Sequence, residues 1–247
     1  MAVMTFAAID IGSYEVSMKI FELSKRIGFR EQNDVRYSLE LGKGAYANSR
    51  IDTEMLDVLC EILNDFKRLM KDFGVTEYRA CGTSAFRELA NPLITVEQIL
   101  RRTGLKIEVL SSAEQHFLGY KSIAAIEKGF KKMIQKGTAI LDVGGGSLQV
   151  SLFDKDSLVS TQNIRIGNLR IRERVAAMEH IRKAMDLCPG NEEYRQLYQI
   201  IQSGSRMYTN TGSRYGFQTG GTFCNPICLS WCLLNACCGG NGLYFCC

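Results

Sequence analysis

One sequence pattern occurs twice in this chain of 247 residues. Residues 8–21 read AIDIGSYEVSMKIF, and residues 140–153 read ILDVGGGSLQVSLF. In each copy an apolar run ends in an aspartate, a Gly/Ser turn follows, and a second stretch alternates with the period of a strand. The backbone N–H groups of such a turn point into a concavity that suits phosphate oxygens. An aspartate just before the turn is placed to hold a divalent cation, often through water. The repeat therefore predicts a duplicated unit that grips a phosphate chain from both sides.

The segments between and after the two copies alternate between strand and helix patterns. Apolar side chains from Met55 to Phe73 recur every three or four residues, which predicts a long helix that ends at Gly74. Ser111 and Glu114 have the spacing of a capping box, which predicts the start of another helix. An α/β architecture with mixed sheets is the expected fold class. Further strands are expected at 34–41, 75–81, 105–110 and 158–166, and further helices at 95–103, 111–128 and 167–185.

The chain is expected to divide at a polar, glycine-flanked connector, residues 129–137, which reads GFKKMIQKG. Residues 1–128 would form a first lobe that carries the first Gly/Ser turn. Residues 129–202 would form a partial second lobe that carries the second turn. The two lobes are then related by the repeat, and the phosphate chain would lie between them.

Residues 203–247 differ from the rest of the chain. All 26 acidic residues lie before position 194, whereas seven of the ten cysteines lie after position 223. A frameshifted or misjoined end is the interpretation that fits this change of composition. A metal or disulfide module is the alternative, but the cysteine spacing lacks the paired C-x2-C knuckles of zinc sites. A reducing compartment also disfavours a disulfide framework.

The overall composition excludes several classes of function. The chain is 46% apolar and 23% charged, as in an ordinary globular protein. A net charge of +4, without a basic run that includes aromatic residues, does not indicate a nucleic-acid partner. The N-terminus lacks the basic region of a signal peptide, and no run of about eighteen apolar residues predicts a membrane span. We expect a cytoplasmic protein that contacts neither nucleic acid nor membrane.

The second turn, DVGGGS, must be compared with other glycine loops. It is not a Walker loop, because no Gly-Lys-[Ser/Thr] follows it. It also differs from a dinucleotide-binding loop, which opens a helix, because residues 147–154 alternate as a strand. A tight hairpin without a ligand remains an alternative, although the second copy with its own aspartate disfavours it.

Several motifs together resemble one known family. They are DIGS at 10–13, TSAFRELAN at 83–91, EVLSSAEQ at 108–115, DVGGGS at 142–147 and IRIGNLRIRE at 164–173. In this order they resemble the exopolyphosphatase and guanosine pentaphosphate phosphohydrolase family (Ppx/GppA), within the sugar kinase, Hsp70 and actin superfamily. The resemblance covers about residues 5–180.

The resemblance implies two actin-like, ribonuclease H-like lobes, of which the second is incomplete here. It implies Mg²⁺-dependent release of the terminal phosphate from polyphosphate or from the alarmone pppGpp. Members of the family often dimerise, a point on which this sequence is silent. By position, Asp10 and Asp142 would hold the metal, and Arg87 would bind phosphate through its guanidinium fork. The two phosphate loops would consist of Gly12, Ser13, Gly144, Gly145, Gly146 and Ser147.

This sequence departs from the family pattern at the positions of the catalytic carboxylates. The glutamate that the resemblance implies as the activator of water is Gln115, and a second expected glutamate is Gln149. A carboxamide does not accept a proton at neutral pH, and loss of a general base typically costs ~10²–10⁴-fold in rate. Two functions therefore remain open. The chain is either a hydrolase with impaired or relocated catalysis, or a module that binds polyphosphate or a guanosine polyphosphate without hydrolysing it.

Two other groups have open roles. Glu15 follows the first turn, where it would either face the phosphate site as a replacement base or face solvent as a strand residue. Glu114 is the neighbour of Gln115, and the capping-box role is the preferred interpretation for it. A set of arginines near 167–185 would form either a solvated basic face or a stripe that attracts a polyanion. These arginines are Arg165, Arg170, Arg172, Arg174 and Arg182.

Overall fold

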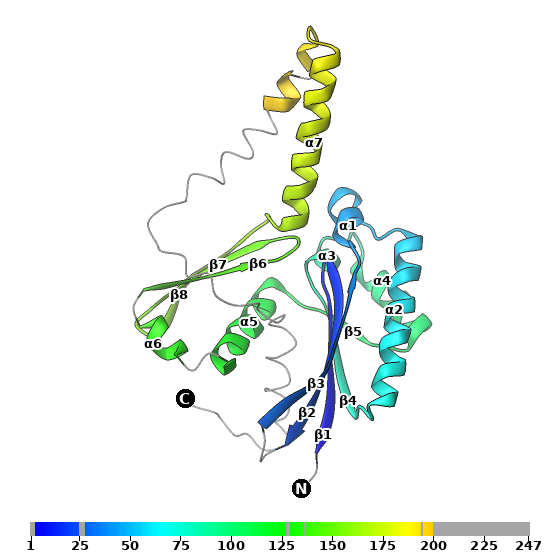
Figure 1. Cartoon of the computed structure of the whole chain (residues 1–247), viewed down its shortest axis with the longest axis vertical. Coiled ribbons are helices and arrows are strands. Elements are labelled where there is room, and N and C mark those ends of the chain that lie inside the picture. Colours follow the sequence, from blue (N-terminus) through cyan, green and yellow to red (C-terminus); the bar gives the residue numbers. More distant parts are fainter. Residues whose placement is uncertain (1–2, 25–27, 127–128, 136, 194, 200–247) are drawn as a thin grey trace.

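The computed structural model describes residues 3–24, 28–126, 129–135, 137–193 and 195–199. The proposed tail, 203–247, lies outside the described residues. The residues that the structure describes form two separate sheets, one of five strands and one of three (Figure 1). We call the five-stranded sheet with the helices that precede residue 104 the first lobe, and the three-stranded sheet with the helix that follows it the second lobe.

The first sheet has the strand order β3-β2-β1-β4-β5. Strands β1, β2 and β3 form an antiparallel meander, whereas β4 and β5 run parallel to β1. This combination makes the sheet mixed, as expected from the sequence. The bounds are β1 (Met4–Ile11), β2 (Glu15–Ser24), β3 (Gly28–Ser38), β4 (Glu77–Gly82) and β5 (Ile107–Val109).

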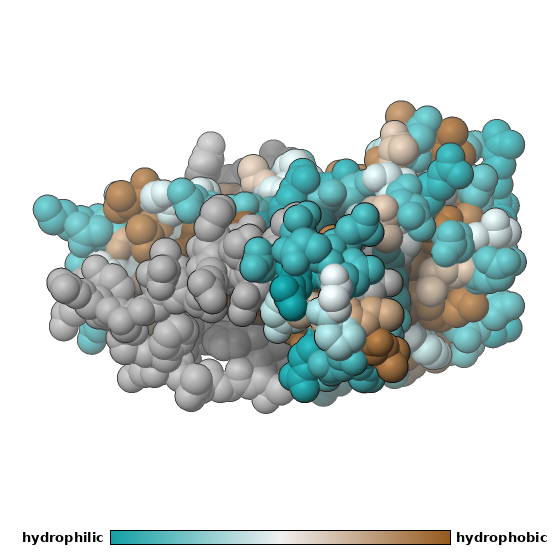
Figure 2. Space-filling model, turned by 90° about the horizontal axis from the view of Figure 1, so that it is seen from above, coloured by the Kyte–Doolittle hydropathy of each residue, from teal (hydrophilic) through white to brown (hydrophobic). Residues whose placement is uncertain are grey.

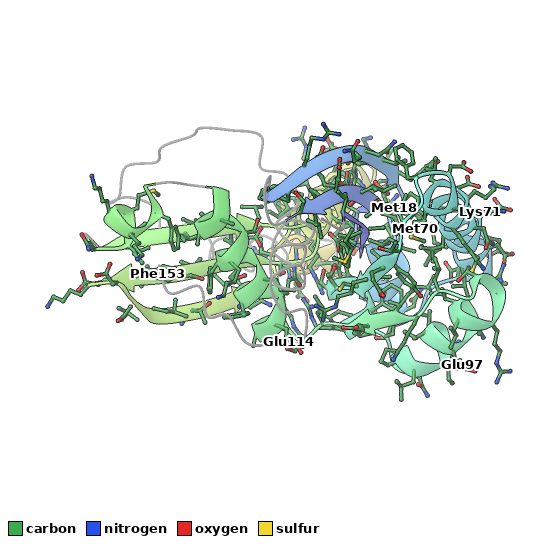
Figure 3. All side chains as sticks on the ribbon, turned by 90° about the horizontal axis from the view of Figure 1, so that it is seen from below. Met18, Met70, Lys71, Glu97, Glu114 and Phe153 are labelled. Carbon is green, nitrogen blue, oxygen red and sulfur yellow. The ribbon has the colours of Figure 1, made fainter. Side chains whose placement is uncertain are left out.

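The main core lies between one face of this sheet and the helices α2 (Thr53–Asp72) and α4 (Pro92–Thr103), which lie on the same side of it (Figure 1). Alternate residues of β1 and β2 face these helices because side chains in a strand have period two. Met18 of β2 and Met70 of α2 both belong to this core, and both are labelled in Figure 3. The apolar stripe that predicted α2 is therefore the stripe that packs against the sheet.

The ends of these helices follow local rules. Gly74, just beyond α2, has φ +61°, and Gly104, just beyond α4, has φ +75°. Glycine adopts this left-handed conformation without strain, which explains why both helices stop there. Helix α4 begins at Pro92, three residues earlier than expected, because the Asn91 side chain accepts a hydrogen bond from the N–H of Ile94 at 3.4 Å.

The capping box that the sequence predicts is confirmed at the start of α5 (Ser112–Ile126). The backbone N–H of Ser111 donates to Oε2 of Glu114 at 2.8 Å, and the N–H of Glu114 donates to Oγ of Ser111 at 3.2 Å. The Ser111 hydroxyl also donates to Oε2 of Glu114 at 2.7 Å. This bond and the one from the Ser111 N–H lower the pKa of the Glu114 carboxyl group, against a smaller opposing effect of burial. Helix α5 lies on the side of the first sheet that faces the second lobe, and Figure 3 places Glu114 at this junction.

The second sheet has the order β6-β7-β8 and repeats the meander of β1–β3. Its strands are β6 (Thr138–Val143), β7 (Leu148–Asp154) and β8 (Ser157–Ile164), and α7 (Asn168–Leu187) follows them. Helix α7 projects away from both sheets (Figure 1). Within the described residues the second sheet contains these three strands alone.

Three short helices were not predicted: α1 (Gly42–Asn48), α3 (Ser84–Arg87) and α6 (Phe130–Ile134). The last lies inside the segment 129–137, which the sequence predicts to connect the two lobes. Strand β3 also begins at Gly28, six residues before the predicted start. It is an edge strand with mostly polar, exposed side chains, so its first half shows little apolar alternation.

The described surface is mostly hydrophilic, with apolar side chains in small groups, when seen from the end that carries α7 (Figure 2). Among the residues that the structure describes, no helix is long and apolar enough to cross a membrane.

Candidate phosphate-binding site

The two Gly/Ser turns have the same local geometry. In loop 1 (residues 12–14) the N–H of Gly12 donates to the carbonyl oxygen of Glu15 at 2.9 Å. In loop 2 (residues 144–147) the N–H of Gly144 donates to the carbonyl oxygen of Ser147, also at 2.9 Å. The sequence repeat is therefore a repeat of structure, with one hydrogen bond closing each turn.

The two loops lie against each other. A Cβ atom at position 145 would be 3.2 Å from Cβ of Tyr14 and 3.4 Å from Cβ of Ser13, so loop 2 packs directly on loop 1. The start of α7 holds loop 2 in place, because the N–H groups of Asn168 and Leu169 donate to the carbonyl oxygens of Gly144 and Gly145 at 3.1 and 2.9 Å. The fold thus brings together the two motifs that the sequence places about 130 residues apart.

The two aspartates occupy equivalent places, at the second-to-last residue of β1 and of β6. Asp10 is buried, with 5% of its surface exposed, and is paired in register with Ser17. Asp142 is paired in register with Gln149, and burial raises the pKa of its carboxyl group. A buried carboxylate gains stability from a nearby cation, and carboxylate oxygens are the ligands that Mg²⁺ and Ca²⁺ prefer. The donor chemistry therefore fits a hard divalent cation.

This fit rests on two carboxylates and not on a preformed cage. In the described part of the chain, no group of three or more His, Cys, Asp or Glu side chains lies close enough to enclose a metal ion. A site with one or two carboxylates is typical of Mg²⁺, which keeps several waters and takes further oxygens from substrate phosphates.

Three hydroxyl groups from separate elements meet beside loop 1. Oγ of Ser13 is 2.6 Å from Oγ of Ser84, which lies in α3, and the hydroxyl of Tyr46 in α1 donates to Oγ of Ser13. The Tyr46 hydroxyl is also 3.1 Å from Oγ of Ser84. A Cβ atom at position 146 would overlap this tyrosine hydroxyl, so only glycine allows loop 2 to approach so closely. Sequence reasoning missed Tyr46 because no motif marks it, whereas Ser84 lies in the TSAFRELAN motif.

Arg87 lies at the end of α3, and two acceptors orient its guanidinium. Its Nη1 donates to the carbonyl oxygen of Leu110 at 2.8 Å and to Oε1 of Gln115 at 3.0 Å. Burial lowers the pKa of Arg87, although an arginine stays protonated at neutral pH. Burial and the nearby Arg87 charge lower the pKa of His116 to about 4, so this imidazole is neutral at pH 7. The hydrogen bond from Arg87 holds Gln115 beside the guanidinium, and the Gln115 side chain carries no charge.

The Gln149 side chain points toward the hydroxyl groups of neighbouring residues. It is 5% exposed, and its Nε2 donates to the Tyr120 hydroxyl at 2.9 Å and to Oγ of Ser151 at 3.2 Å. Tyr120 belongs to α5, so this hydrogen bond joins β7 to the helix beside the first lobe. The ring of Tyr120 also packs edge-on against Phe153, with centroids 5.2 Å apart. Gln149 thus participates in packing between β7 and α5.

Glu15 lies at the first residue of β2, and its Oε1 forms an ion pair with Nη1 of Arg36 on β3 at 3.4 Å. This contact turns the carboxylate toward the neighbouring strand of its own sheet. The sequence leaves two roles open for Glu15, a replacement base at the phosphate site or a strand residue that faces solvent. The ion pair with Arg36 favours the second role.

A pocket of about 130 Å³ lies where loop 2, α3, the start of α5 and the end of β8 meet. It contains three of the residues that the sequence assigns to phosphate binding, Arg87, Gly146 and Ser147. Loop 1 borders the same region through the contact of Ser13 with Ser84. The lining residues are Ser84, Arg87, Glu88, Ser112, Gly146, Ser147, Asn163 and Arg165.

Arginines at the start of α7 connect the two lobes. Arg170 donates from Nε to the carbonyl oxygen of Gly146 at 3.0 Å, stacks on the Tyr46 ring at 3.7 Å, and pairs with Glu88 at 3.1 Å. Arg172 forms an ion pair with Glu40 of the first lobe. Three of the five arginines noted in the sequence, including Arg165, therefore contact acidic side chains of the first lobe. Arg170 is the best covered of the three, at 21% exposed, whereas Arg165 and Arg172 stay 78% and 51% exposed while they make these contacts.

Comparisons with known proteins agree with this geometry. Residues 28–187 match the Ppx/GppA phosphatase family, so the chain belongs to that family. The chain is 24% identical over 176 residues to a bifunctional 3-dehydroquinate synthase/phosphatase of Fusobacterium nucleatum, which covers 68% of this chain and 26% of that protein. It is 24% identical over 206 residues to the guanosine-5'-triphosphate,3'-diphosphate pyrophosphatase of Photobacterium profundum, which covers 78% of this chain and 39% of that protein.

The fold also matches a solved structure of the family. The exopolyphosphatase from Cytophaga hutchinsonii superimposes with a TM-score of 0.62 at 21% identity, which covers 75% of this chain and 61% of that one. The predicted α/β fold class and the predicted family are thereby confirmed. The chain spans less than half the length of the two sequence relatives named above. The Ppx/GppA phosphatase family generally implies a divalent metal.

Proposed function

We propose that this chain binds the terminal phosphate groups of polyphosphate or of a guanosine polyphosphate and releases the terminal phosphate with Mg²⁺. The observation that carries the proposal is the meeting of two equivalent phosphate loops beside Arg87. Relatives named as an exopolyphosphatase and a guanosine pentaphosphate pyrophosphatase support this choice of substrates.

The binding roles follow from the chemistry of each group. The backbone N–H groups of loops 1 and 2 offer donors to phosphate oxygens. Arg87 adds a charge-assisted donor, and the Leu110 and Gln115 oxygens hold its guanidinium in position. Asp10 and Asp142 would hold Mg²⁺, which when bound neutralises phosphate charge and stabilises the charge that develops on the leaving oxygen.

This chain lacks a well-placed base to remove a proton from the attacking water. Gln115 cannot accept a proton at neutral pH, and the Gln149 amide is hydrogen-bonded to Tyr120. Glu15 is paired with Arg36, and Glu114 caps α5. Hydrolysis is therefore expected to be slow, by ~10²–10⁴-fold relative to a site with a glutamate base.

The lack of a general base also favours a second function, in which the protein binds a phosphate chain without hydrolysing it. The residues expected to bind phosphate are all present in the sequence, whereas both expected glutamates are carboxamides. A protein of this kind would change its conformation or its binding partners when a phosphate chain is bound. It would hydrolyse the chain at a negligible rate.

The test compares phosphate release from long-chain polyphosphate, with Mg²⁺ present, by the parent protein and its Gln115→Glu variant. Gln115 accepts a hydrogen bond from Arg87, so a glutamate there keeps this partner and adds a base. We expect release to rise at least ~10²-fold in the variant. Gln98→Glu, on α4 away from the pocket, is the matched control. Equal release by the folded parent and by Gln115→Glu would overturn the assignment of position 115. Release that is measurable in the variant and absent in the parent would favour the binding function.

A further inference from the structure

The pocket contains charged residues that the proposed phosphate-binding roles do not use. Besides Arg87 and loop 2, it is lined by Glu88 from the end of α3 and by Asn163 and Arg165 from the end of β8. Its volume is about 130 Å³, whereas ~10–15 Å³ is enough to admit one water. The pocket therefore has room for a phosphate group and part of its neighbour.

The two arginines that contact Glu88 are held to different extents. Arg170 is 21% exposed, and three contacts hold it, to Glu88, to the Gly146 carbonyl and to the Tyr46 ring. Arg165 is 78% exposed, and its Nε is 3.5 Å from Oε1 of Glu88. Exposed ion pairs of this length contribute little to stability. Arg165 can therefore leave Glu88 at small cost, and Arg170 then continues to compensate the carboxylate.

The neutral groups of the pocket also suit an anion. Nδ2 of Asn163 donates to Oγ of Ser112 at 3.1 Å, so the Ser112 hydroxyl accepts this bond and keeps its own proton to donate. Ser84 and Ser147 line the same space. Hydroxyl donors beside an arginine form a site for phosphate oxygens, because a guanidinium fork matches two of these oxygens at once.

We propose that Arg165 determines specificity for linear phosphate chains by binding the second phosphate group of such a chain. When no chain is bound, the Arg165 guanidinium forms its ion pair with Glu88. This inference rests on the proposed function, because it assumes that the terminal phosphate lies at the two loops. It narrows the ligand class to chains with at least two adjacent phosphate groups, and it predicts discrimination against orthophosphate.

The test is calorimetric titration of the full chain with orthophosphate and with tripolyphosphate, at one fixed Mg²⁺ concentration. Arg165→Gln should weaken tripolyphosphate binding about tenfold, through loss of a charge-assisted hydrogen bond. It should change orthophosphate binding by less than about twofold. Glu88→Gln should tighten tripolyphosphate binding by about two- to fivefold, because Arg165 no longer has a competing partner.

Glu40→Gln is the matched control. Glu40 also joins the two lobes, through Arg172, but it does not line the pocket. It should leave both affinities within about twofold of the parent, which separates the pocket effect from loss of a lobe contact. If Arg165→Gln weakened both ligands equally or neither, the inference would be wrong and the proposed function would stand. If the folded parent bound no tripolyphosphate, the proposed function and this inference would both be overturned.

Discussion

Loop 2 lies so close to Tyr46 that position 146 has no room for a side chain. Replacing Gly146 by alanine adds a Cβ that overlaps the Tyr46 hydroxyl and lies 3.0 Å from Oγ of Ser84. The tyrosine must then move away from Ser13 and Ser84 and from its stacking position under Arg170.

The expected cost follows from the contacts that are lost. A net hydrogen bond contributes ~0.5–1.5 kcal/mol, and a cation–π contact at a partly exposed site contributes ~0.5–1 kcal/mol. Loss of one or two hydrogen bonds together with the stacking amounts to ~1–4 kcal/mol, which is similar to the cost of overpacking a core. For a protein of this size, each kcal/mol lowers the melting temperature by ~2–4 °C.

The assay is chemical and thermal unfolding of Gly146→Ala beside Gly144→Ala. Gly144 is the matched control, because a Cβ there would make only an ordinary contact of 3.4 Å with the Ser147 carbonyl oxygen. Adding Tyr46→Ala to each variant completes a double-mutant cycle, in which Gly146 and Tyr46 should couple by at least ~1 kcal/mol. Equal stability of the Gly146→Ala and Gly144→Ala proteins would refute the packing of loop 2 on Tyr46.

Three further predictions concern the stability that Asp34 and Ser111 contribute and the reactivity of two cysteines. Burial raises the pKa of Asp34, but hydrogen bonds and charges of Arg36 and Lys19 lower it more, so its folded pKa lies below the ordinary 3.8. The resulting stability is present at neutral pH and is lost as the pH falls through the lowered pKa. Asp34→Asn should therefore cost about 1 kcal/mol at pH 7 and almost nothing near pH 2 in urea titrations. Removing the capping box with Ser111→Ala should cost ~1 kcal/mol, measured as a lower melting temperature; an unchanged value would contradict the cap. Burial raises the pKa of the Cys81 thiol to about 12, so brief alkylation at pH 7.5, mapped by mass spectrometry, should modify the exposed Cys188 and leave Cys81 intact.

Local signals in the sequence predicted those parts of the fold that depend on near neighbours. The repeated turn was recognisable because one hydrogen bond within four residues closes it in both copies. Helix α2 was recognisable because one apolar stripe faces one sheet, and the capping box at Ser111 needs only the spacing of two side chains. Helices α1, α3 and α6 have seven, four and five residues, which is too short for a periodic pattern to emerge.

Part of the candidate site consists of residues that the sequence singled out. Arg87, Gly146 and Ser147, which the family motifs assign to phosphate binding, line one pocket, and their role in binding stays a prediction. The role of Glu88 and the direction of the Gln149 side chain depend on contacts between segments far apart in the chain. Tyr46 was missed for the same reason, because its partners lie in loop 1, in α3 and in α7. No pattern within one segment shows which side chains of another will meet it.

The most direct test of the central claim, that the two loops and Arg87 hold a phosphate chain, is calorimetric titration of tripolyphosphate into the full chain and its Arg87→Gln variant. Arg87 has two protein acceptors, so thermal unfolding of the variant without ligand provides the control for folding. We predict binding at one site in the parent and affinity ~10–100-fold weaker in the folded variant, as expected for a charge-assisted hydrogen bond to phosphate. No binding by the folded parent, or equal binding by both proteins, would contradict the account.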